Sequence, residues 1–219
     1  MNSEEIFDLN IKIQKMLNKL SFEELVDLTA SELHEIWKKT TFYVDKETGE
    51  TKQVEKWKKL NPNENEEERE YVQRILSDER FFTLPYVRKE EDGNISIDIG
   101  KMKYSQLSPH WQKENKEAAE VAVELTLDNY VYLANPTQRE VLVKVIGSAI
   151  HLLWKNRPAN AWAKNTELAA RYSNLPIEEQ KKDDRHIFIA EKAIEYLSKK
   201  MGIDKDLEDV KKLKNSSKR

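Results

Sequence analysis

The sequence contains no cysteine, which excludes disulfides, thiolate zinc sites and cysteine nucleophiles within this chain. Glycine is also scarce, at five residues in 219, and no glycine-rich loop of the kind that cradles a phosphate is present. There is no long uncharged apolar run, and the first residues, 1–5, are acidic. We therefore expect neither a signal peptide nor a membrane span, and a protein of a reducing compartment, the cytoplasm.

The sequence also lacks a large excess of either acidic or basic residues. The chain has 37 basic and 40 acidic residues, a net charge of -3, so nothing in its overall charge favours nucleic acid or an anionic membrane. Five basic residues gather at 211–219, and the remaining chain is more acidic without them. Binding of nucleic acid by the fold itself is therefore not expected.

A block with the pattern His-x-x-Trp occurs twice in the sequence. A second block, Tyr-Ser-x-Leu followed by a glutamine, comes after each copy, and the spacing from tyrosine to glutamine is the same both times. The paired residues are His34 and His151, Trp37 and Trp154, Tyr104 and Tyr172, and Gln112 and Gln180. A repeated supersecondary unit is a stronger guide to architecture than local propensity. We therefore expect two related helical repeats that pack as one body.

The fold class predicted from these patterns is mainly α, with two β-hairpins inserted in the first repeat. Turn-forming residues separate apolar runs at 41–54 and again at 84–99, which is typical of hairpins. Asn135 and Pro136 are suited to the N-cap and N1 positions of a helix that carries the second His-x-x-Trp block. The expected division is 1–130 for the elaborated first repeat, 131–202 for the compact second repeat, and 203–219 for a basic, flexible tail.

The second copy resembles the ryanodine-receptor-type repeat (RyR domain), a small, mostly helical module found in animal channels and in bacterial and phage proteins. The elements that carry the resemblance are His151-x-x-Trp154, Trp162, Tyr172-x-x-Leu175-Pro176 and a charged run that ends in Asp184-Arg185. The glycine-rich stretch of the family around its second tryptophan is replaced here by 160–164. The first copy has no Asp-Arg pair, which puts a ligand role for that copy in doubt.

The resemblance implies a non-enzymatic binding protein, encoded by a phage or a bacterium, in the bacterial or infected-host cytoplasm. Its ligand would be a small, planar, anionic molecule derived from a nucleotide, and the protein would sequester a host defence signal. The alternative is a protein–protein adaptor or inhibitor of a host protein, and a weaker alternative is nucleic-acid binding. The sequence leaves the oligomeric state open, and a homo-oligomer is one possibility.

Eight residues are the candidate ligand-binding set. An indole can stack a planar ligand, an imidazole can donate to it, and an arginine positioned by an aspartate can hold an anion. The set is His151, Trp154, Trp162, Arg185, Asp184, Tyr172, His34 and Trp37. The competing interpretation is structural: buried histidines bonded to backbone carbonyls, core tryptophans, and an Asp-Arg pair that caps a helix.

No catalytic residue, metal ligand or cofactor is expected. Neither histidine has a second ligand at metal-binding spacing. Asp183 and His186 could form a coupled acid–base pair, but no nucleophile or oxyanion donor accompanies them. Two structural observations discriminate between the remaining functions. A concave cavity lined by Trp and Arg would favour the small ligand, and an exposed hairpin edge or apolar patch would favour a protein partner.

Overall fold

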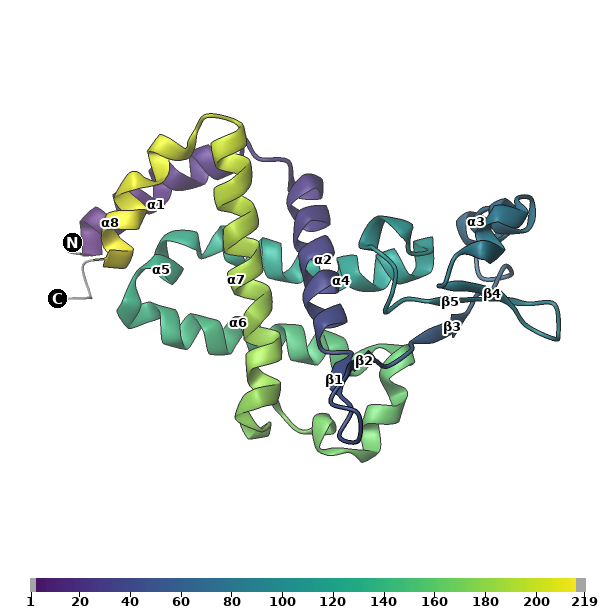
Figure 1. Cartoon of the computed structure of the whole chain (residues 1–219). Coiled ribbons are helices and arrows are strands. Elements are labelled where there is room, and N and C mark those ends of the chain that lie inside the picture. Colours follow the sequence, from purple (N-terminus) through teal and green to yellow (C-terminus); the bar gives the residue numbers. More distant parts are fainter. Residues whose placement is uncertain (1–2, 216–219) are drawn as a thin grey trace. The chain divides into compact units, whose positions relative to one another are not determined.

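The computed structural model describes residues 3–215 (Figure 1). The chain forms two compact units. Unit 1 joins Met1–Thr29 to Lys116–Arg219, and unit 2 is the continuous segment Ala30–Asn115. Unit 2 is therefore inserted in the sequence of unit 1.

These units are not the segments 1–130 and 131–202 that the repeat pattern suggests. Helices α2 (Phe22–Lys39) and α4 (Pro109–Asp128) each contain a boundary between units, so each helix contributes residues to both. The division by repeats follows sequence similarity, whereas the units follow compactness. The repeats therefore stay a prediction about ancestry.

Unit 1 is helical. Around its parts of α2 and α4 it contains α1 (Ser3–Leu17), α5 (Tyr130–Ala134), α6 (Pro136–Asn156), η3 (Pro158–Asn165), η4 (Glu167–Ala169), η5 (Tyr172–Asn174), α7 (Ile177–Lys200), η6 (Asp204–Leu207) and α8 (Glu208–Asn215). Helix α6 packs on α7 and on α5, and α5 also contacts α1 and α8. The expected cap is present, because the Asn135 side chain accepts from the Thr137 amide at the start of α6.

The apolar core of unit 1 comes from residues at helical spacing on each element. Its fully buried members include Ile13, Leu25, Val131, Leu133, Ile146, Ile150, Ile187 and Ile194. Burial of such side chains contributes roughly 1.5–3 kcal/mol each. The α6–α7 contact is therefore the central packing interface of this unit.

The end of the chain differs from the expected flexible tail. Helix α7 ends before Gly202, whose φ of +70° suits glycine at a helix terminus. Residues 204–215 then form η6 and α8, with Leu207 and Val210 buried. Helix α8 lies beside α1 (Figure 1), where Lys12 and Asp209 are 3.4 Å apart. Residues 216–219 of the predicted tail lie outside the described residues.

Unit 2 contains all the strands of the described chain. They are β1 (Phe42–Val44), β2 (Thr51–Gln53), β3 (Trp57–Lys59), β4 (Val87–Lys89) and β5 (Ile95–Asp98). Between and after them come α3 (Glu66–Leu76), η1 (Glu79–Thr83) and η2 (Tyr104–Gln106). Strands β1 and β2 form one antiparallel hairpin, and β4 and β5 form another, so both predicted hairpins are confirmed.

Strand β3 was not expected. It pairs with β5 and makes a three-stranded antiparallel sheet of order β3-β5-β4. All four residues of the central strand β5 are buried. Buried Asp98 accepts hydrogen bonds from the amides of Lys56 and Gly100 and pairs with Lys101 at 3.2 Å. Both amides donate to Oδ1 of Asp98, and the charge on its Oδ2 is balanced by the Lys101 ammonium.

The described chain is mainly helical with small antiparallel sheets, as predicted. No helix within 3–215 combines the length and the apolar character needed to cross a membrane.

Replacement of Ile97 by alanine tests the sheet of unit 2. Ile97 is completely buried in β5, so Ile97→Ala should lower the free energy of unfolding by about 2–5 kcal/mol. Urea denaturation followed by circular dichroism measures the change. The matched control is Ile177→Ala, because Ile177 is 63% exposed and its loss should cost under about 1 kcal/mol. Equal effects of the two substitutions would contradict the burial of Ile97.

Candidate functional site

The two His-x-x-Trp blocks make the same contacts in their separate units. In the first, His34 Nε2 lies 3.1 Å from the carbonyl oxygen of Met102. In the second, His151 Nε2 lies 3.2 Å from the carbonyl oxygen of Ala170. Each carbonyl belongs to the residue two positions before the repeated tyrosine. Because a carbonyl only accepts, Nε2 carries the proton in both histidines.

The ring geometry is also repeated. The centroids of His34 and Trp37 are 5.6 Å apart with planes at 30°, and those of His151 and Trp154 are 5.9 Å apart at 23°. Both histidines are almost fully buried, and burial lowers the pKa of His34. Trp37 is 37% exposed. Each imidazole therefore sits beneath an indole that the solvent still reaches.

The segment after each carbonyl has a common backbone course. The tyrosine opens one 3-10 turn, η2 or η5, which a leucine in extended conformation ends. The side-chain amide of the repeated glutamine then donates back to that leucine carbonyl, at 3.0 Å for Gln112 and 2.8 Å for Gln180. We call these sets the first module (His34, Trp37, Met102, Tyr104, Leu107, Gln112) and the second module (His151, Trp154, Ala170, Tyr172, Leu175, Gln180).

The modules differ in the helix that follows the glutamine. Three residues after it stands Asn115 in the first module and Asp183 in the second. Asn115 donates to the carbonyl of Trp111 in its own helix. Asp183 instead places Oδ2 3.3 Å from Nδ1 of His151. Only the second module therefore joins its histidine to an acid.

The environment of Asp183 favours its neutral form. Its side chain is 14% exposed, and burial, followed by the charges of Asp184 and Glu179, raises the pKa of Asp183 to about 7. A protonated carboxyl can donate to Nδ1 of His151, whose Nε2 proton is held by Ala170. The two side chains are 5% and 14% exposed, so this contact is largely shielded from solvent.

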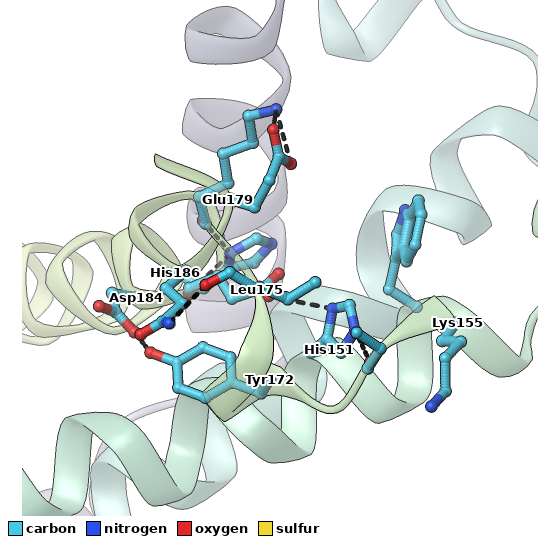
Figure 2. A network of polar contacts seen from close by, with 12 residues as sticks. His151, Lys155, Tyr172, Leu175, Glu179, Asp184 and His186 are labelled. Atoms are coloured by element: carbon cyan, nitrogen blue, oxygen red, sulfur yellow. Dashed lines mark hydrogen bonds and ion pairs between the residues drawn. The ribbon is translucent and has the colours of Figure 1, made fainter. Parts of the chain in front are cut away.

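A second acid, Asp184, bonds to the repeated tyrosine. The Tyr172 hydroxyl donates to Asp184 Oδ1 (Figure 2). Burial raises the pKa of both Asp184 and Tyr172. Gly147 on α6 makes room for the pair, because a Cβ there would lie 2.7 Å from Asp184 Oδ1 and 2.9 Å from the tyrosine oxygen. The first module has Ala30 at the matching position.

His186 lies on the same helix, α7. Its Nδ1 is 3.1 Å from the carbonyl oxygens of both Lys182 and Asp183. Burial, with smaller contributions from the charges of Arg157 and Arg185, lowers the pKa of His186 to about 4. Arg157 is 3.5 Å from Glu117. Arg185 makes no hydrogen bond or ion pair with the residues that the structure describes. His186 therefore lies near two arginines, Arg185 on α7 and Arg157 at the C-cap of α6.

The structure brings together part of the predicted set. His151, Trp154, Tyr172, Asp184 and Arg185 belong to the second module and the start of α7. His34 and Trp37 belong to the first module in unit 2. The side chain of Trp162 lies outside the described residues.

Three contributors escaped the sequence reasoning. Gly147 and the Ala170 carbonyl have no side-chain signature, and the pairing of Asp183 with His151 spans two helices. The sequence analysis paired Asp183 with His186, whereas its carboxyl group lies against His151. The matching offset from the two glutamines, which places Asp183 opposite Asn115, could have indicated that Asp183 belongs to the second module.

No group of three or more histidine or acidic residues within the described part of the chain is arranged to hold a metal ion. A groove of about 480 Å³ lies in unit 1, but it is lined by other residues: Gln14, Leu17, Asn18, Phe22, Glu120, Glu124, Leu127 and Asp128. Neither tryptophan nor arginine lines it. The concave site expected for a small anionic ligand is therefore not this groove.

Comparison with known proteins adds no relative: no protein-family model, curated protein or solved structure matches the chain.

The raised pKa of Asp183 predicts a pH-dependent stability. An unfolded aspartate has a pKa of about 3.9, so below about pH 4 the proton is bound in both states. Between about pH 4 and 7 the folded state holds the extra proton, and its stabilising contribution is lost as the pH rises. Asp183→Asn should remove this part of the pH dependence, on the order of 4 kcal/mol across the interval.

Urea midpoints at pH 5 and 7.5 measure that difference. The control is Asp128→Asn, which removes one exposed carboxylate from α4 and should leave the slope of the wild type unchanged. Parallel pH profiles for the wild type and Asp183→Asn would contradict the assignment.

Proposed function

We propose that this chain is a non-enzymatic protein–protein adaptor or inhibitor that recognises its partner through the β1–β2 hairpin. The observation that carries the proposal is the exposure of three consecutive apolar residues on β1. Phe42 is 49%, Tyr43 47% and Val44 62% exposed. Phe42 and Val44 share one face of the strand and Tyr43 lies on the other, so neither face of β1 is buried in a core.

A two-stranded hairpin is marginally stable on its own in water. This hairpin is fixed at its base, where the Gln53 side chain donates to the Gly100 carbonyl at 2.7 Å and to Thr41 Oγ1 at 3.0 Å. Within the described residues, β1 pairs with β2 alone. Its other edge therefore presents backbone groups that can form hydrogen bonds with an extended segment of a partner. The apolar side chains of β1 would be buried in the same contact.

We propose further that the two modules are diverged RyR-type repeats. The matching histidine, glutamine and ring contacts support a common origin of the modules, and the family name rests on the sequence resemblance. The setting suggested by that resemblance, a phage or bacterial protein acting on a host protein, is part of the same proposal.

Photo-crosslinking tests the hairpin. A photoreactive phenylalanine analogue at Phe42 should give a discrete covalent adduct in cells of the source, because a partner covers β1. The same analogue at Phe188, which is 48% exposed in unit 1, is the matched control. Val44→Thr keeps strand propensity but removes apolar area, and should reduce the Phe42 adduct severalfold. Identical adducts from both positions, or none from Phe42, would refute this surface.

A second candidate is the small anionic ligand, which the surroundings of Arg185 favour. Arg185 has no partner among the described residues, and both it and Arg157 act on His186. A phosphate or carboxylate could bind this guanidinium in a bidentate manner.

Calorimetric titration with cyclic nucleotides and ADP-ribose derivatives tests this second function. Binding of one such compound should weaken by about tenfold or more in Arg185→Ala, since a charge-assisted hydrogen bond contributes about 1.5–3 kcal/mol. Arg69→Ala, an exposed arginine of α3, is the control and should bind as the wild type does. Absence of heat with the whole panel would end the nucleotide hypothesis.

A further inference from the structure

The groove of unit 1 has a composition unlike that of the modules. Its floor is apolar, from Leu17 at the end of α1, Phe22 at the start of α2, and Leu127 on α4. The Gln14 side chain donates to the Leu127 carbonyl at 2.8 Å and so ties α1 to α4 at the groove. Its volume, about 480 Å³, falls in the range of small-molecule sites.

One wall of the groove is a row of carboxylates. Glu120, Glu124 and Asp128 follow one another at four-residue intervals on α4, and all three line the groove. Residues four apart lie on one helix face, about 6 Å from each other along the axis. The preceding residue of the row, Lys116, is paired with Asp27 at 2.7 Å.

The three carboxylates themselves have no hydrogen bond or ion pair within the described chain. The lining includes no lysine or arginine, and Gln14 and Asn18 of α1 and the turn after it add amide groups. The groove therefore combines unneutralised negative charge, an apolar floor and amide oxygens that can accept.

The spacing decides which cation fits. A metal ion needs several ligands at about 2–2.6 Å from one centre, and the described residues form no such cluster here. A row of carboxylates about 6 Å apart suits charges separated along a chain. An extended four-carbon linker sets two ammonium groups at a similar distance, and its methylenes can lie on an apolar floor.

We propose that the groove formed by α1, α2 and α4 binds a linear aliphatic polyamine. Its ammonium groups pair with Glu120, Glu124 and Asp128, and its methylene chain covers Leu17, Phe22 and Leu127. The proposal concerns unit 1 and does not depend on the hairpin of unit 2, so either can fail alone.

Calorimetry with the purified full chain at low salt tests the proposal with three probes. Spermidine should bind more tightly than putrescine, and putrescine several times more tightly than ethylenediamine, which carries its two charges on a two-carbon linker. Raising the salt to 0.5 M should weaken all three, because exposed ion pairs are screened. Equal affinities for putrescine and ethylenediamine would overturn the spacing argument.

Two matched triple variants locate the site. Glu120→Gln, Glu124→Gln and Asp128→Asn together should weaken spermidine binding by about tenfold, since exposed ion pairs contribute about 0.2–1 kcal/mol each. The control makes the same change in net charge at exposed positions of α3. It combines Glu66→Gln, Glu67→Gln and Glu70→Gln, and should bind spermidine as the wild type does. Equal weakening in both variants would show general charge attraction and overturn the site.

Two competitors complete the test. Magnesium chloride at the same ionic strength should displace spermidine no better than sodium chloride does. A lysine-rich peptide should compete more weakly than spermidine does. Tighter binding of the peptide would assign the groove to a protein segment, and strong displacement by magnesium would assign it to divalent cations. Either result would overturn the proposal that the groove binds a polyamine.

Discussion

The hydrogen bond from a buried imidazole to a backbone carbonyl is the constraint on which each module depends. His34 and His151 close their helices onto the turn that precedes the next helix, and the bond fixes the imidazole tautomer. A buried polar group without such a partner costs about 1–3 kcal/mol, so the histidine can be buried only where the carbonyl meets it. The tryptophan one turn later then covers the imidazole. Histidine in this pattern is therefore first a structural residue.

A single exchange of asparagine for aspartate separates the two modules. Asn115 satisfies itself within its own helix, whereas Asp183 turns to His151. Together with Asp184, which accepts from Tyr172, Asp183 places two acids against the second module. Two acids beside His151 and Tyr172 disfavour an anionic ligand at the imidazole itself, so Arg185, the residue after Asp184 on α7, is the stronger candidate for binding an anion.

Much of the fold could be predicted from the sequence, because its signals are local. Helical spacing, the Asn135-Pro136 start and the two hairpin turns all report on neighbouring residues. Strand β3 was missed because Trp57-Lys58-Lys59 has no alternating pattern, and its strand partner β5 lies far away in the sequence. Helix α8 was missed because its basic residues conceal the two apolar contacts, Leu207 and Val210, that secure it. The repeated blocks correctly indicated matching contacts, but the acid that reaches His151 and the groove on α4 come from long-range packing, which spacing alone does not reveal.

The insertion of Ala30–Asn115 between the two parts of unit 1 bears on how the chain is made. Unit 2 is continuous, so all of it has left the ribosome while most of unit 1 is still untranslated. Domains generally fold as they emerge, and the sheet can therefore assemble early. Helix α1 is synthesised before unit 2, and its partner helix α5 is synthesised after unit 2. The apolar face of α1 is thus covered after unit 2 has been synthesised.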